Sequence, residues 1–206
     1  TFSTPLTITV GAPPVATILS PQDGSFFIAG NVIAFRGAAT DAQGGVLPAS
    51  ACTWNIDFLH EGHMHPGTPI AAVTSGSFTI PTTGHDFSGN TRYRITLTVT
   101  DLDGLADAKS VIIWPTKVNL TFGTVPSGLT LYLDGIAKVA PFVNDSLLNF
   151  NHSIEASDQA SVTTTYTFAF WSDGGTQTHT ITVPASAPRR ASRGRRRQGG
   201  PGACAA

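Results

Sequence analysis

The sequence predicts an all-β protein of two consecutive β-sandwich modules followed by a disordered basic tail. The composition favours strands and turns over long helices, with 28 Thr, 21 Gly and 14 Pro against 3 Lys and 1 Met. Short alternating apolar and polar segments recur at roughly the 8–12 residue spacing of sandwich strands. Because 41% of the residues are hydrophobic and 12% are charged, the chain can bury a core, which excludes disorder of the whole chain.

Prolines divide the chain into segments. Pro13 and Pro14 follow a predicted strand at 4–10, so residues 1–12 are predicted to be the last strand of a preceding domain. Pro115 marks the end of a first module, residues 13–115, whose length is normal for a sandwich domain. Its predicted strands are 16–19, 32–38, 53–58, 77–80, 93–100 and 109–114.

Strict alternation predicts which side chains of the first module are buried. In the segment 93–100, Tyr93, Ile95, Leu97 and Val99 fall on one face, and Arg and Thr side chains fall on the other. The segment 53–58 alternates likewise. We therefore expect Trp54 to lie in the core, where sandwiches commonly keep a large aromatic residue.

The second module is predicted at 116–187. Its predicted strands are 118–122, 129–133, 141–143, 150–156, 164–171 and 178–183. Asp134 and Gly135 give the strongest short hairpin signal in the sequence.

The tail carries a charge opposite to that of the rest of the chain. Residues 189–206 carry six Arg and no acid, whereas residues 1–188 have a net charge of −7. Residues 188–206 offer too little apolar area to bury, so they are predicted to be disordered and to leave the strand at 178–183 or its neighbour with an open edge. The Arg residues lack interleaved aromatic side chains, and we expect no nucleic-acid partner.

The number of cysteines and the length of the apolar runs indicate where in or outside the cell the protein is expected to occur. Cys52 and Cys204 are the only cysteines, and we expect no structural disulfide, which fits a bacterial exported protein. No apolar run approaches the roughly 18 residues of a membrane span. The chain starts at Thr1 without a leader-like segment, so we expect it to be a segment of a longer protein.

The first module resembles a PKD-type (polycystic-kidney-disease-like) immunoglobulin-like domain. The resemblance rests on Trp54 and on the stretches Ala12-Pro-Pro-Val-Ala16, Gly37-Ala-Ala-Thr-Asp41 and 93–104. The usual Trp-Asp-Phe-Gly-Asp-Gly signature is replaced here by Trp54-Asn-Ile-Asp-Phe58, which indicates a divergent branch.

The second module resembles a small bacterial β repeat found at the ends of secreted multidomain proteins. It shares Val125-Pro-Ser-Gly128, Leu133-Asp-Gly135 and Phe170-Trp-Ser-Asp-Gly-Gly175. The tandem is similar to the C-terminal region of secreted bacterial proteins that carry a glucose/sorbosone (PQQ-type) dehydrogenase-like propeller. The resemblance implies two consecutive immunoglobulin-like sandwiches that act as an extracellular, non-catalytic spacer, adhesion or substrate-proximity segment, with the neighbouring domains as partners.

Two alternatives to this function stay open. One module binds carbohydrate and targets the parent enzyme to a polysaccharide. Trp54, Trp114 and Trp171 are possible sugar-stacking residues, and Trp171 is the candidate platform because it precedes a turn at the domain end, although core packing is the favoured interpretation of its ring. In the other alternative the chain is part of a metal-dependent enzyme. The sequence has no nucleophile elbow, P-loop, GxGxxG or paired-cysteine zinc spacing, so no catalytic residue is predicted.

One histidine cluster is the candidate metal site, in the sequence His60-Glu-Gly-His63-Met-His65. If Glu61 and Gly62 form a two-residue turn, His60 opposes His63, and His65 lies on the same face. Three imidazoles suit a divalent transition metal, and His85 or Asp86 is the candidate fourth ligand. The competing interpretation is a solvated polar loop whose histidines pack on one another or on Trp and Phe side chains.

The acidic stretch from Asp101 to Asp107 resembles part of a calcium loop. It lacks a bidentate Glu at the twelfth position and lies where a hairpin must turn. We therefore predict a turn there without a bound ion.

Overall fold

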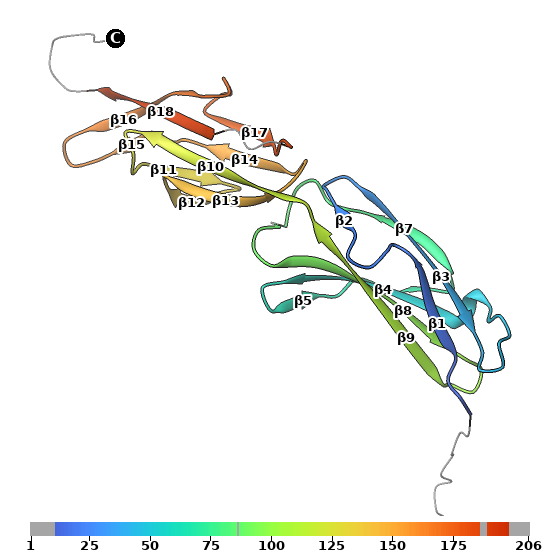
Figure 1. The fold of residues 1–206 in the computed structure, drawn as a ribbon. Coiled ribbons are helices and arrows are strands. Elements are labelled where there is room, and N and C mark those ends of the chain that lie inside the picture. Colours follow the sequence, from blue (N-terminus) through green and yellow to red (C-terminus); the bar gives the residue numbers. More distant parts are fainter. Residues whose placement is uncertain (1–10, 86, 186–188, 198–206) are drawn as a thin grey trace, which may run out of the picture. The chain divides into compact units, whose positions relative to one another are not determined.

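The computed structural model describes residues 11–85, 87–185 and 189–197 (Figure 1). Within these ranges it contains eighteen strands and one 3₁₀ helix, Ala49–Ala51, which confirms the all-β class. None of the helical residues in the described ranges forms a segment long and apolar enough to cross a membrane. The predicted strand at 4–10 lies outside the described residues.

The described chain divides into two compact units. The first comprises residues 11–27, 31–80 and 89–115. The second comprises the remaining described residues, most of which follow Pro115.

The first unit contains two sheets. One is three-stranded, in the order β1 (Val15–Ser20), β3 (Val32–Thr40), β7 (Ser75–Thr79). The other has the order β2 (Phe26–Phe27), β9 (Ala106–Pro115), β8 (Thr91–Thr100), β4 (Cys52–His60), β5 (His63–His65), with β6 (Ile70–Ala71) also paired to β4. All pairs are antiparallel except β2 with β9.

Aromatic side chains join these two sheets. Trp54 is fully buried, as predicted, and its ring centre lies 4.8 Å from that of Phe35 on β3. Its indole Nε1 donates a hydrogen bond to the carbonyl oxygen of Val73 at 3.0 Å, so the polar edge of the ring is satisfied. Ile95 and Leu97 are also fully buried, which confirms the face predicted from alternation in β8.

The second unit also contains two sheets. Its four-stranded sheet has the order β12 (Ile136–Val139), β11 (Thr130–Leu133), β14 (Asn151–Glu155), β17 (Thr178–Thr182). Its five-stranded sheet has the order β13 (Phe142–Leu147), β10 (Lys117–Val125), β18 (Arg189–Arg197), β16 (Thr165–Trp171), β15 (Gln159–Ala160).

The predicted hairpin of the second unit is confirmed. Asp134 and Gly135 have φ values of 52° and 78°, and Leu133 pairs with Ile136. The Asp134 carboxylate accepts a hydrogen bond from the Ser153 backbone N–H at 2.8 Å and lies 2.6 Å from Nδ1 of buried His152. The turn is thereby tied to β14.

The expectation of disorder across residues 188–206 is wrong for residues 189–197. The backbone of β18 pairs in parallel with β10 and antiparallel with β16. Strand pairing needs only backbone N–H and C=O groups, so a segment poor in apolar residues can complete a sheet whose two neighbours would otherwise have open edges. Residues 186–188 and 198–206, including Cys204, lie outside the described residues.

Replacing Gly37 with Ala should destabilise the first unit. A Cβ on Gly37 would lie 2.5 Å from Cδ2 of Leu97 and 2.9 Å from both the Thr17 carbonyl oxygen and Cζ2 of Trp54. Overpacking of this kind costs about 1–3 kcal/mol. The matched control is Gly123→Ala on β10, where nothing lies within 4 Å of the new Cβ. Calorimetry should show a lower melting temperature for Gly37→Ala only, and equal effects would contradict the close approach.

Deleting residues 189–206 should lower the melting temperature of the second unit by at least about 5 °C, because β10 and β16 each lose a pairing partner. The control deletes residues 198–206 alone and retains β18. If both deletions melt alike in calorimetry, β18 does not contribute to the fold.

Candidate functional site

The hairpin of β4 and β5 carries the three clustered histidines. Glu61 and Gly62 form its two-residue turn, with φ values of 40° and 87°. His60 pairs directly with His63, which confirms the predicted register. Because side chains alternate along a strand, His65 shares a face with His63.

The histidine rings lie close together on this face. The Nε2 atoms of His63 and His65 are 3.1 Å apart, and the ring centres of His60 and His63 are 5.1 Å apart. The Phe58 ring lies 6.2 Å from His60 and 6.1 Å from His65, measured between ring centres. Imidazole nitrogens therefore converge beside an aromatic side chain that is almost entirely buried.

The other two predicted ligands come from the segment that precedes β8. His85 belongs to the second unit, and Asp86 lies outside the described residues. The described ranges contain no group of three or more His, Cys, Asp or Glu side chains arranged to hold a metal ion. The atoms that lie close together are Nε2 of His63 and Nε2 of His65.

On the outer face of this sheet, opposite the histidines, side chains of neighbouring strands form a row. Phe26 pairs with Trp114, and Leu59 pairs with both Arg92 and Met64. The Arg92 guanidinium lies over the Trp114 ring, 5.5 Å from its centre, and joins the two halves of the row. We call Phe26, Trp114 and Arg92 the outer-face platform.

Polar groups border the outer-face platform. Arg92 Nη1 donates to Asn90 Oδ1 at 3.1 Å. Arg94 Nη2 donates to Asp57 Oδ2 at 2.8 Å and lies 3.0 Å from the Met64 sulfur. These side chains surround a hollow of about 290 Å³ lined by Leu59, His60, Gly62, His63, Met64, Asn90, Arg92 and Arg94.

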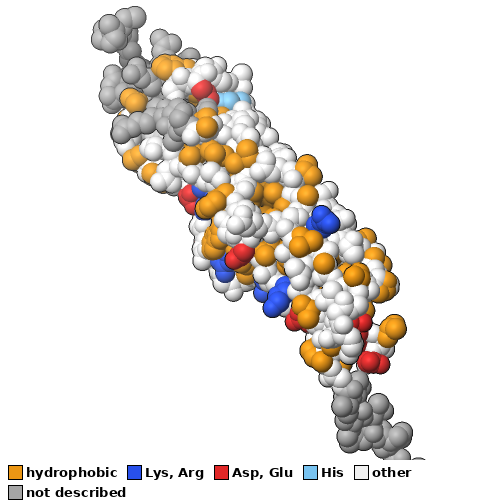
Figure 2. Space-filling model, turned by 45° about the vertical axis from the view of Figure 1, so that its right-hand side comes forward, with side chains coloured by type: hydrophobic (Ala, Val, Ile, Leu, Met, Phe, Trp, Pro, Cys, Tyr) orange, Lys and Arg blue, Asp and Glu red, His pale blue; other side chains and the backbone are white. Residues whose placement is uncertain are grey.

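Trp114 and Trp171 differ in how much of the side chain is exposed to solvent. Phe26 and Trp114 are 69% and 37% exposed, whereas Trp171 is 2% exposed and donates its Nε1 hydrogen to the Gln177 carbonyl oxygen. The burial of Trp171 confirms core packing, the interpretation favoured from the sequence, and contradicts a sugar platform there, because stacking requires an accessible ring face. Figure 2 shows hydrophobic side chains interspersed among mostly uncharged ones on one face of the molecule.

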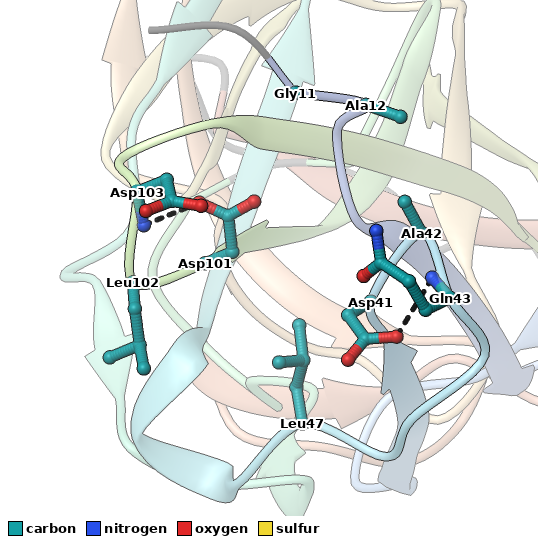
Figure 3. A pocket seen from close by; sticks show the side chains of 9 residues that line it. All are labelled: Gly11, Ala12, Asp41, Ala42, Gln43, Leu47, Asp101, Leu102 and Asp103. Atoms are coloured by element: carbon teal, nitrogen blue, oxygen red, sulfur yellow. Dashed lines mark hydrogen bonds between the residues drawn. The ribbon is translucent and has the colours of Figure 1, made fainter.

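A second hollow of about 290 Å³ in the first unit is lined by Asp41 on one side and by Asp101 and Asp103 on the other (Figure 3). Asp101 Oδ1 accepts hydrogen bonds from the Asp103 and Leu105 backbone N–H groups at 2.9 and 2.8 Å. Asp41 Oδ1 likewise accepts from the N–H groups of Gln43 and Gly45. The predicted hairpin turn is confirmed, since these carboxylates hold turn backbones.

Three other side chains with titratable groups are at least partly buried, namely Cys52, Tyr93 and His152. Burial raises the pKa of the Cys52 thiol and raises the pKa of Tyr93 to about 12, so both groups keep their protons at neutral pH. His152 is fully buried against Phe150, with 5.0 Å between ring centres, and Nδ1 faces Asp134. Its Nε2 has no hydrogen-bond partner among the described residues.

Comparison with protein-family models, with curated proteins and with solved structures found no match to this chain.

Sequence reasoning considered Trp114 as a sugar platform but missed Phe26 and Arg92, the other members of the outer-face platform. Phe26 belongs to a two-residue strand that falls in none of the predicted segments, and its pairing with Trp114 joins distant parts of the chain. The available signal was the pair of adjacent phenylalanines, Phe26 and Phe27, in a segment closed by Gly30. In a sandwich such a pair places one ring inside and one outside.

Proposed function

We propose that the chain is a non-catalytic accessory segment of a larger secreted bacterial protein, formed by two immunoglobulin-like modules. The observation that supports this proposal is the division into two compact β units, each with its own buried tryptophan, Trp54 in one and Trp171 in the other. A unit with its own core can act as a spacer or carry a binding surface without contributing to another domain's core.

The resemblance of residues 13–114 and 117–186 to modules of secreted bacterial proteins supports the same proposal. In that arrangement the catalytic part is a sugar dehydrogenase-like propeller elsewhere in the parent chain. Fold alone does not assign function, so the proposal needs a test of the parent itself.

Sequencing the genomic region and transcript upstream of the codon for Thr1 tests this proposal. The expected result is one continuous reading frame with an export signal and at least one larger domain before residue 1. A start codon immediately before Thr1, with no upstream domain, would overturn the accessory role.

The outer-face platform supports a second candidate function, carbohydrate binding by the first unit. Trp114 and Phe26 occupy adjacent positions on one sheet face, and both are exposed. A flat indole ring stacks against the C–H face of a pyranose, which gains apolar burial and a favourable π contact.

Hydrogen-bonding groups beside the platform fit sugar hydroxyls. Arg92, Arg94 and Asn90 line the adjoining hollow and offer guanidinium and amide N–H groups. The Arg92 side chain touches both the Trp114 ring and this hollow. A sugar chain that stacks on Trp114 can therefore extend its next residue toward these donors.

A glycan array probed with the full chain tests carbohydrate binding. Trp114→Ala and Phe26→Ala should each weaken the glycan signal at least about tenfold, because each removes part of the stacking surface. Phe170→Ala is the matched control, since Phe170 is an exposed aromatic side chain of the second unit. Absence of glycan binding, or equal loss in the control, would rule out this function and favour a spacer.

A further inference from the structure

We propose that the β4–β5 hairpin binds a divalent transition-metal ion of the Cu²⁺, Ni²⁺ and Zn²⁺ class through Nε2 of His63 and Nε2 of His65. The site belongs to the first unit and is independent of the accessory role proposed above. It also lies on the opposite sheet face from the outer-face platform.

The backbone places the two histidines side by side without any contribution from a distant segment. The turn at Glu61 and Gly62 fixes the pairing of β4 with β5 through three residue pairs. Two positions apart on one strand, His63 and His65 project from the same face. The chelating pair is therefore built by local geometry.

The distance between the two nitrogens matches a shared metal ion. For bonds of about 2.0 Å, neighbouring ligand atoms lie about 2.8 Å apart in a square-planar site and about 3.3 Å apart in a tetrahedral site. The observed separation of 3.1 Å falls between these values. The separation therefore allows both nitrogens to reach one ion.

Neighbouring rings flank both proposed ligands. Phe58 stacks on His65, with an interplanar angle of 30°, and His63 meets His60 and His65 edge to face at 63° and 71°. A ligand held near its bound orientation loses less side-chain entropy when the metal binds. His63 is the central member of the cluster because it neighbours both other rings.

A hydrogen bond between the two imidazoles is the competing explanation of the 3.1 Å distance. In that case one Nε2 carries a proton and the other accepts it. Metal binding instead requires both rings to be neutral with the proton on Nδ1, so that both Nε2 lone pairs face the ion. The two explanations differ in whether the protein takes up metal.

The donor set determines the class of ion. Neutral imidazole nitrogens suit Cu²⁺, Ni²⁺ and Zn²⁺, whereas Ca²⁺ and Mg²⁺ prefer oxygen. Within the first class Cu²⁺ binds most tightly. Two protein ligands leave the remaining positions to water, so an outside donor can also reach the ion.

Titration of the full chain, without an added histidine tag, with CuCl₂ tests the site. Calorimetry should give one Cu²⁺ per chain, and electron paramagnetic resonance should show coupling to two imidazole nitrogens. His63→Ala and His65→Ala should each weaken Cu²⁺ binding at least about tenfold, and His60→Ala should have a smaller effect. ZnCl₂ and NiCl₂ should bind more weakly than CuCl₂, and CaCl₂ should give no signal.

His179→Ala is the matched control, because both ring nitrogens of this second-unit histidine already face oxygen atoms, of Thr176 and Asp173. Its Cu²⁺ affinity should equal that of the unmodified chain. Circular dichroism of the metal-free variants checks their folding, and His63→Gln replaces His63→Ala if the latter unfolds. Failure to bind one Cu²⁺, or unchanged binding in both the His63 and His65 variants, would overturn the site.

Discussion

The pairing register of β4 with β8 is the constraint on which the first unit depends. Nine consecutive pairs run without a shift from Cys52 with Val99 to His60 with Thr91. Because side chains alternate, this register directs Trp54 into the core and Leu59 to the outer face. A slip of one residue would exchange the two faces and place Trp54 in solvent. The same pairs place Arg92, a member of the outer-face platform, opposite Leu59 on the outer face.

Local sequence patterns predicted those features whose determining residues lie close together in the chain. Alternation within β8 is sufficient to identify its buried face. The histidine register follows from the six residues His60 to His65, since a two-residue turn leaves one arrangement for the flanking positions. The Asp134–Gly135 hairpin is predictable for the same reason. In each case no distant strand has to be placed before the geometry is defined.

Features that depend on distant strand pairing were not predictable from these patterns. Phe26 meets Trp114 only because β2 pairs in parallel with β9, and neither segment encodes that partner. The position of β18 depends on two neighbours with unpaired backbone groups, whereas composition reports only what side chains can bury.

The place of β18 has a consequence for biosynthesis. This strand is the last of the described strands to be translated, but it lies in the middle of its sheet, between β10 and β16. All strands of the first unit precede residue 116 and can pair while the ribosome is still elongating the chain. In the second unit, by contrast, the edges of β10 and β16 that pair with β18 stay unpaired until residues 189–197 have been translated. A nascent chain stalled before that point is a substrate for chaperones and a hazard for aggregation.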